Sequence, residues 1–428
     1  MPSDTSGLRA LVLAFGTAGV GVGITLAVPA LADYAPWQPG DALPLVRTLL
    51  PQASARVQED ERGELVVAPA VPEVLSDAVA LTTPGASPSP AAEAPLTAAT
   101  PVRADPALPA RPPAIPQALV DEGNRGMSTF YAALSRGEGL VRAAHYGDST
   151  IAADGISGTV RRRLQARFGD GGPGFISAGN DPRWSVRPDV STSRTGTWDT
   201  VSILLGGGKG HYGYGGTAST ASADSYTVVR APKGAGGAYQ RMSRLEVYLQ
   251  RSAAGGQWWL SADDESVGGG SALASGTVDE VHRFDLPRGY SKVAFGASTG
   301  PVTFYGVVME TNGPGVVWDA LGVVGVGSKS FNYHHGPSFA RQVAERAPEL
   351  VVVMIGGNET GFPALKSGSG AGYEAVYREA VGTIRAGAPQ ASCLLVTPLD
   401  QGTREGGDAR SKPALARLVA VQRRVAEA

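Results

Sequence analysis

The chain has 428 residues, enough for two or three domains. Its 37 basic and 39 acidic residues give a net charge of -2, and the absence of a long basic run argues against a nucleic-acid partner. A single cysteine, Cys393, excludes an intrachain disulfide framework; it lies in an apolar run that predicts a buried strand. Only His334 and His335 are adjacent, so the sequence supports no metal site and implies no cofactor.

The first 32 residues contain an apolar stretch, residues 8–32, interrupted only by Arg9 and two threonines. It is long enough to cross a bilayer as a helix. It also ends in Ala-Leu-Ala at residues 30–32, a pattern typical of a signal-peptidase site. A cleaved signal peptide and a retained membrane anchor are therefore both open, and either predicts export.

Residues 33–116 show no sustained apolar period, and residues 82–116 are rich in Pro and Ala. Prolines at this density favour extended conformers, which predicts a semi-rigid linker that holds a folded domain away from a membrane. The alternative is a tail with no positional role.

The globular part opens with a predicted helix over residues 117–136 and a buried strand over residues 140–146. A Gly-Asp-Ser turn, residues 147–149, and an amphipathic helix follow. A serine between a strand and a helix lies near the positive end of that helix, where an anionic intermediate is stabilised. Ser149 is therefore a candidate nucleophile; the alternative is that Asp148 and Ser149 only cap the helix. The arginines of this helix, Arg161 included, are predicted to be solvated.

Residues 184–311 change to short alternating segments separated by Gly and Ser turns, which predicts an inserted antiparallel β-sandwich. Tyr212, Tyr214 and Trp258 are candidates for stacking on sugar rings, and core packing is the alternative for each. Because neighbours on a strand face opposite sides, at least one of Trp258 and Trp259 belongs to the core.

The remaining residues, 312–428, return to an α/β pattern. The apolar run 350–355 predicts a parallel strand, and Asn358 follows it as a candidate donor to an oxyanion or as a loop cap. Residues 316–327 form a further strand and a glycine-rich turn in which a backbone amide can approach a ligand. A fourth strand is predicted at 393–396, with helices at 372–385 and 413–428.

These blocks resemble the SGNH, or GDSL-type, hydrolase family. His-Tyr-Gly-Asp-Ser at 145–149 is similar to its first block, the turn near Gly325 to its second, and Gly-Gly-Asn-Glu at 356–359 to its third. The resemblance implies a flavodoxin-like parallel sheet with helices on both faces, interrupted by a jelly-roll-like sandwich as in bacterial peptidoglycan O-acetylesterases. It also implies that Ser149 is the nucleophile and that Ser149, Gly325 and Asn358 form the oxyanion hole, with Gly322 and Gly327 as neighbouring alternatives to Gly325.

The sequence departs from the family in one respect. The family's late Asp-x-x-His block, which supplies the general base, does not occur, and the last strand of the family's sheet is also missing. Truncation, a histidine from elsewhere (His145, His334 or His335) and a non-catalytic protein are the three explanations, and truncation is the preferred one.

The expected protein is an exported or envelope-anchored serine esterase that removes O-acetyl groups from a polysaccharide such as peptidoglycan. An acetyltransferase of the same fold and a non-catalytic glycan-binding protein are the alternatives.

Overall fold

The computed structural model describes residues 119–121, 126–179, 181, 183–205, 208–234, 237–366, 370–405 and 408–428, and the short strands β1 (Val57–Glu59) and β2 (Leu65–Val67). Contacts divide the chain into two units, Met1–Pro112 and Pro113–Ala428. In the first unit β1 and β2 form an antiparallel pair. The predicted export segment and the Pro-rich part of the linker lie outside the described residues. Among the residues that the structure describes, no helix is long and apolar enough to span a membrane.

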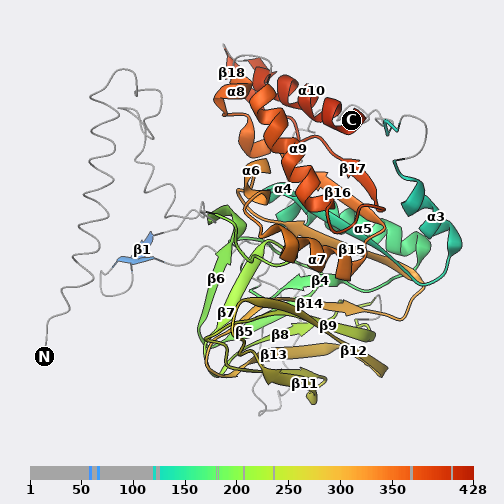
Figure 1. The fold of residues 1–428 in the computed structure, drawn as a ribbon, viewed down its shortest axis with the longest axis vertical. Helices are drawn as coiled ribbons and strands as arrows, with labels where there is room; N and C mark the ends of the chain where they lie inside the picture. Colours follow the sequence, from blue (N-terminus) through green and yellow to red (C-terminus); the bar gives the residue numbers. More distant parts are fainter. Residues whose placement is uncertain are drawn as a thin grey trace, which may run out of the picture. The chain divides into compact units, whose positions relative to one another are not determined.

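The second unit contains a parallel sheet whose strands follow the order β15-β3-β16-β17, and Figure 1 shows it between helices. Its strands are β3 (Leu140–Gly147), β15 (Gly315–Gly322), β16 (Leu350–Met354) and β17 (Ser392–Leu395). Every side chain of β16 is buried, because a parallel strand covered on both faces requires apolar residues in sequence. The predicted α/β fold is confirmed.

Helices cover both faces of this sheet. On one face α3 (Ser128–Arg136) and α5 (Gly155–Phe168) pack against alternate residues such as Val141 and Ala143. On the other face Ala144 and Tyr146 join a core that includes α7 (Gly336–Arg346), α9 (Ala371–Arg385) and α10 (Pro413–Glu427). The short helices α6 (Ser328–Phe331) and α8 (Pro363–Lys366) lie in the loops after β15 and β16.

The inserted part is a sandwich of two antiparallel sheets, drawn below the parallel sheet in Figure 1. One sheet has the order β11-β10-β13-β8-β5, and the other has the order β12-β9-β14-β7-β6, with β4 also paired to β14. The strands are β4 (Gly174–Ser177), β5 (Ser191–Thr195), β6 (Trp198–Ser202), β7 (Thr217–Ala221), β8 (Ser225–Arg230), β9 (Met242–Arg251), β10 (Gln257–Ala262), β11 (Glu265–Ser271), β12 (Val278–Tyr290), β13 (Lys292–Thr299) and β14 (Val302–Glu310). The predicted all-β insertion is thereby confirmed.

Buried ion pairs join the sandwich to the parallel sheet. The guanidinium of Arg346, on α7, lies 2.6 Å from Glu310 at the end of β14 and 2.7 Å from Asp319 on β15. Arg142 of β3 also pairs with Glu310, at 2.8 Å, and the Tyr214 hydroxyl donates to Asp319 at 3.0 Å. Although burial alone would raise it, the two guanidinium groups lower the pKa of Glu310 to about 2.

Two expectations about the helix after Ser149 were wrong. Ser149 begins a helix of only four residues, α4 (Ser149–Ala152), because Asp154 adopts a left-handed conformation (φ 55°) and interrupts the helix before α5. A helix this short contributes little dipole at Ser149. Arg161, predicted to be solvated, is buried and pairs with Asp154 at 2.6 Å.

Two histidines are buried in this core. Burial lowers the pKa of His145 to about 4, against the raising effect of Asp154, and lowers that of His334 to about 3, with Lys209 adding to the shift. His145 accepts a hydrogen bond from the Trp318 indole at 3.3 Å, and His334 stacks on Phe339. Both rings are therefore neutral in the folded protein at pH 7.

These two histidines predict a loss of stability in mild acid. Between pH 6.5 and pH 4 the unfolded chain binds protons that the folded chain excludes, so the free energy of unfolding falls as the pH falls, by a few kcal/mol in all. Denaturant unfolding across this range measures the slope. The His334→Phe variant should flatten the slope, whereas the half-exposed His282, replaced by Gln, should leave it unchanged; equal slopes in all three proteins would contradict the prediction.

Candidate functional site

The ends of three parallel strands meet at one edge of the sheet. Gly147 at the end of β3 lies in register with Gly322 of β15 on one side and with Met354 of β16 on the other. Ser149 follows Gly147 by two residues, and the Gly147 carbonyl accepts a hydrogen bond from Val323 at 3.0 Å. The sheet therefore places Ser149, the turn around Gly325 and the loop of Asn358 at the same edge, where open α/β sheets bind ligands.

Ser149 is exposed at the start of α4, and its neighbour Asp148 is buried. The Asp148 side chain accepts a hydrogen bond from the Thr150 amide at 2.9 Å, so Asp148 is the residue that caps the helix. Position 147 has to be glycine, since a Cβ atom there would lie 2.2 Å from the Ile151 side chain. Among the described residues no group accepts a hydrogen bond from the Ser149 amide or hydroxyl, so both are available to a ligand.

The turn after β15 presents one unpaired amide. Within the described part of the chain no group accepts a hydrogen bond from the Gly325 amide, whereas the Gly327 amide donates to the Ser330 hydroxyl at 3.4 Å and Gly322 lies within β15. Gly325 has φ +83°, a conformation that favours glycine. Gly325 is thus the glycine of this turn whose amide has no acceptor among the described residues.

Asn358 lies on η4 (Gly357–Glu359), immediately after β16. Its side-chain nitrogen donates one hydrogen to the Val326 carbonyl at 2.8 Å, which holds the amide against the Gly325 turn and leaves its second hydrogen for a ligand. The structure therefore gathers the three predicted residues, with up to three donors for an oxyanion.

Glu359 connects the loop after β16 to the loop after β15, and it was not predicted as a site residue. It is fully buried, and one carboxylate oxygen accepts a hydrogen bond from the Ser328 amide at 2.7 Å. Its other carboxylate oxygen is buried without a partner in the described structure. Burial raises the pKa of Glu359, and the charge of Asp148 adds to that effect.

Replacing Glu359 with glutamine tests this buried carboxyl. Because its folded-state pKa is raised, ionising Glu359 costs stability that grows as the pH rises above the unfolded value near 4.5. The Glu359→Gln variant keeps an acceptor for the Ser328 amide and should gain in melting temperature over wild type more at pH 8 than at pH 4.5. Glu359→Ala should lose about 1–3 kcal/mol of unfolding free energy by leaving that amide unpaired; a pH-independent difference for the glutamine variant would contradict the argument.

Gln401, in the loop after β17, is a second residue that sequence reasoning missed. Its side-chain nitrogen donates to the Gly357 carbonyl at 2.7 Å, and its oxygen accepts from the Thr360 hydroxyl at 2.9 Å. Gln401 therefore fixes the backbone on which Asn358 is carried. Gln401 follows the carboxyl end of a parallel strand, as Ser149 and Asn358 do. This position could have indicated from the sequence that Gln401 lies near the site.

The histidines do not complete a triad in the described structure. His145 is buried beneath the site and bonded to Trp318, and His334 is buried against Phe339. His335 stacks on His211 with ring centres 4.7 Å apart, and His211 bonds to Asp279 on the sandwich at 3.0 Å. No described histidine hydrogen-bonds to Ser149, and no three His, Cys, Asp or Glu side chains of the described residues are grouped as metal ligands.

The predicted sugar-stacking aromatics are corrected in part. Tyr214 is fully buried, with its hydroxyl on Asp319, and Trp258 is 5% exposed with its ring near His282, so neither presents a free face to a ligand. Tyr212 is half-buried and meets His334 edge to face. Trp259, the neighbour of Trp258, is half-exposed, in agreement with alternate facing along a strand.

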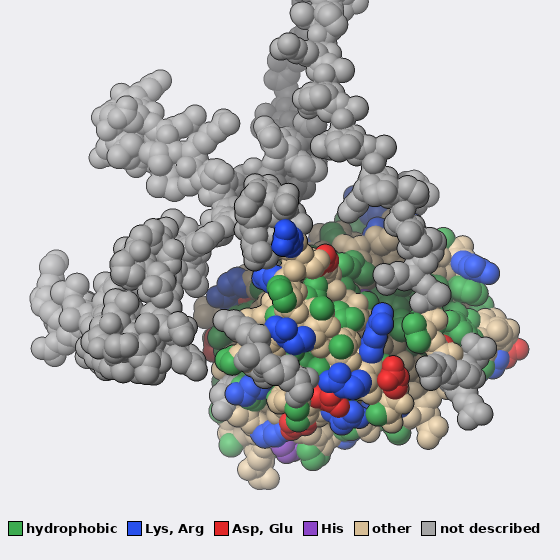
Figure 2. Space-filling view, turned by 90° about the horizontal axis from the view of Figure 1, so that it is seen from above, with side chains coloured by type: hydrophobic (Ala, Val, Ile, Leu, Met, Phe, Trp, Pro, Cys, Tyr) green, Lys and Arg blue, Asp and Glu red, His purple; other side chains and the backbone are tan. Residues whose placement is uncertain are grey.

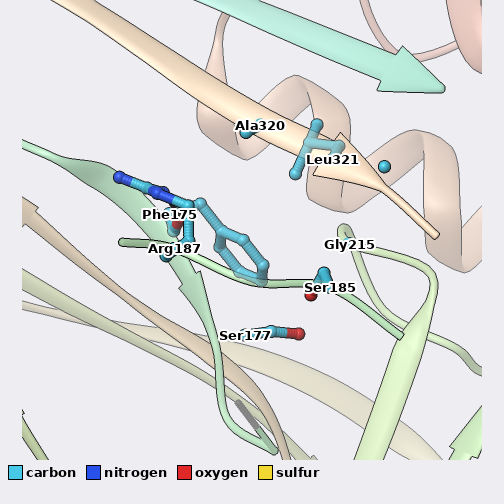
Figure 3. A pocket seen from close by; sticks show the side chains of 8 residues that line it. Phe175, Ser177, Ser185, Arg187, Gly215, Ala320 and Leu321 are labelled. Carbon is cyan, nitrogen blue, oxygen red and sulfur yellow. Dashed lines mark hydrogen bonds between the residues drawn. The ribbon is translucent and has the colours of Figure 1, made fainter. Parts of the chain in front are cut away.

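Figure 3 shows a small cavity between the insertion and β15. Its volume is about 10 Å³, enough for one water molecule at most. The cavity is lined by Phe175, Ser177, Ser185, Arg187, Gly215, Ala320, Leu321 and Gly322. Because it is too small for a substrate and Ser149 does not line it, the open strand edge remains the candidate site. On the face seen in Figure 2, Lys and Arg side chains are scattered among apolar ones and form no single basic patch.

Comparison with known proteins gives a family match for part of the chain and a solved structure of the same fold. Residues 290–428 match the model of the GDSL-like lipase/acylhydrolase family. A solved structure described as a peptidoglycan O-acetylesterase in action is similar over 71% of this chain and 81% of its own, with 20% identity and a TM-score of 0.57, which establishes a shared fold. Comparison with curated proteins gives no match.

A family two carbohydrate esterase from Clostridium thermocellum covers 55% of this chain and 84% of its own at 11% identity. Its TM-score is 0.20, too low to support an argument. The family match and the shared fold lead to one conclusion: residues 290–428 resemble a GDSL-like lipase/acylhydrolase domain, and the chain has the fold of a solved peptidoglycan O-acetylesterase, with a β-sandwich beside its parallel sheet.

Proposed function

We propose that the protein is an exported serine esterase that removes O-acetyl groups from a cell-envelope polysaccharide, with peptidoglycan as the preferred substrate. One observation carries the proposal: the exposed Ser149 hydroxyl lies at the same sheet edge as two unpaired amides, of Ser149 and Gly325, and the oriented side chain of Asn358. Such an arrangement of donors stabilises the oxyanion of a tetrahedral intermediate.

The chemistry follows from these groups. The Ser149 oxygen attacks the ester carbonyl carbon and loses its proton to a base, while the new oxyanion accepts hydrogen bonds from the three donors. The bond from the carbonyl carbon to the sugar oxygen then breaks, and the sugar leaves as an alcohol after it takes the proton. Water attacks the acyl-serine, which releases acetate and restores Ser149.

The substrate class and the location rest on separate support. The solved structure of the same fold is described as a peptidoglycan O-acetylesterase, and the insertion in our chain is a sandwich, an architecture shared with many carbohydrate-binding modules. The apolar residues 8–32 support export, as a cleaved signal or as an anchor that holds the enzyme at the envelope.

The experiment measures acetate released from O-acetylated peptidoglycan by the wild type and by Ser149→Ala, with imidazole present as a base. Release that depends on Ser149 is expected. A larger yield of acetyl groups on an added glycan than of free acetate would identify a transferase instead, and equal release by both proteins would overturn the proposal.

A second candidate function, binding of envelope glycans without catalysis, follows from the positions of the histidines. Since no described histidine hydrogen-bonds to Ser149, the protein can also be read as a non-catalytic binder of envelope glycans that uses its sandwich. Binding of peptidoglycan with unchanged affinity in Ser149→Ala, and no acetate release even with added imidazole, would favour this function over the first.

A further inference from the structure

A segment of the insertion crosses the edge of the candidate site. The Trp184 carbonyl accepts a hydrogen bond from the Val324 amide at 2.9 Å, and the Val186 amide donates to the Ala152 carbonyl at 2.9 Å. Val324 immediately precedes Gly325, and Ala152 ends the helix that starts at Ser149. The segment therefore bonds to the nucleophile loop and to the oxyanion loop at once.

A second part of the insertion packs on the Gly325 backbone. Leu204 belongs to the short helix η3 (Ile203–Leu205), which is anchored by the fully buried Ile203 and by a bond of 2.9 Å from the Ile203 amide to the Gly216 carbonyl. A Cβ atom at position 325 would lie only 2.8 Å from a Leu204 methyl carbon. The end of the Leu204 side chain would therefore have to shift to make room for one more carbon atom beside Gly325.

The two parts form an apolar wall on one side of the site. Val186 is 38% exposed and Val324 is 37% exposed, so both valines keep surface for a ligand, and Leu204 is half-buried and packs against the core. The opposite side, around Asn358, is polar, because Gln401, Thr360 and Asp148 surround the backbone there. An ester of a sugar has the same asymmetry, with an apolar acyl group on one side of the carbonyl and a hydroxylated ring on the other.

We infer that the acyl group lies against the wall of Val186, Val324 and Leu204, and that Leu204 limits the enzyme to short acyl groups. The inference rests on the proposed esterase function and adds to it the residues that would select the acyl group. It also gives the insertion a role at the ester itself. In the acyl-enzyme the carbonyl carbon is bonded to the Ser149 oxygen, and its alkyl chain extends toward Leu204.

The test compares kcat/KM for 4-nitrophenyl acetate, butyrate and hexanoate, with imidazole present as a base. Wild type should prefer acetate. Leu204→Ala should raise the butyrate-to-acetate ratio by about 10-fold or more, because one methylene in an apolar pocket changes selectivity by that order. Leu204→Val, a smaller change that also guards against misfolding, should shift the ratio in the same direction by less.

Leu399→Ala is the matched control, since Leu399 is an exposed leucine in the loop that follows β17. It should leave the ratio unchanged. Hydrolysis that depends on Ser149 but shows the wild-type ratio in both Leu204 variants would overturn the inference and leave the esterase proposal standing. Hydrolysis that is equal in Ser149→Ala and wild type would overturn the esterase proposal, and the acyl wall with it.

Discussion

With imidazole added, wild type is expected to hydrolyse 4-nitrophenyl acetate faster than imidazole alone does, and Ser149→Ala is expected to remove that excess completely. The reason is that our proposal assigns Ser149 as the nucleophile and the amides of Ser149, Gly325 and Asn358 as oxyanion donors, while no described histidine hydrogen-bonds to Ser149 to accept its proton. A positioned general base contributes about 10²–10⁴-fold to catalysis. Added imidazole has to diffuse to the site, so it should raise the Ser149-dependent rate by only about 10-fold over the rate without imidazole.

Three measurements decide this prediction. The Ser149→Ala protein gives the background of imidazole and of other surface groups under identical conditions. Asn358→Ala should lower the Ser149-dependent rate by about 10²–10³-fold, because it removes one oxyanion donor. A burst of nitrophenol equal to the enzyme concentration would report the acyl-serine. If the imidazole-dependent rate is the same in wild type and Ser149→Ala, Ser149 is not the nucleophile.

Arg346→Ala is expected to lower the free energy of unfolding by about 3–5 kcal/mol, the range for breaking a buried ion pair. The Arg346 side chain is 1% exposed, and it pairs with Glu310 and Asp319, whose side chains are 0% exposed. Removing the guanidinium would leave two buried carboxylates, between the sandwich and the parallel sheet, with less opposite charge nearby. Their desolvation is then no longer offset, which is why the effect should exceed that of any surface pair.

Urea unfolding followed by far-ultraviolet circular dichroism measures this loss. Arg378→Ala is the matched control, because Arg378 is 48% exposed and pairs with Glu374 at 3.2 Å one helical turn away. Its loss should be below about 1 kcal/mol, as for other exposed pairs. The Arg346 effect should shrink below pH 4, as Glu310 is protonated on the way to its pKa of about 2. A loss of less than 1 kcal/mol in Arg346→Ala would show that the joint is held by apolar packing alone.

Much of the fold could be predicted from local pattern. The apolar run 350–355 has to be a strand covered on both faces, and β16 occupies Leu350–Met354. The alternating segments of the insertion were likewise readable, because one face of each strand of a sandwich is buried. The strands β5, β7 and β11 are exceptions to this pattern. Their residues are Ser-, Thr- and Gly-rich and carry little apolar alternation, so pairing to neighbouring strands, and not their own pattern, makes them strands.

The candidate site residues could be predicted from the sequence, but the contacts that surround them could not. The sequence blocks predict Ser149, Gly325 and Asn358 as site residues because each follows a strand. Which of their N–H groups have no acceptor depends on hydrogen bonds between distant parts of the chain. Arg161 shows the same limit: its helical position suggested a solvated face, whereas Asp154, seven residues earlier, turns back and pairs with it at 2.6 Å. Tyr214 and Trp258 were predicted as sugar contacts, but Tyr214 is buried against the parallel sheet and Trp258 is buried inside the sandwich.

The sequence by itself therefore determined the order of the three motif blocks, the α/β class and the presence of an all-β insertion, because periodicity and turn residues are local properties. Only the tertiary structure decided that Glu359 and Gln401 bond to the loops after β15 and β16, and that Trp184, Val186 and Leu204 of the insertion lie against the Gly325 turn and the end of α4. These contacts join residues far apart in the chain. Their existence depends on how the sandwich sits on the sheet, which no local pattern encodes.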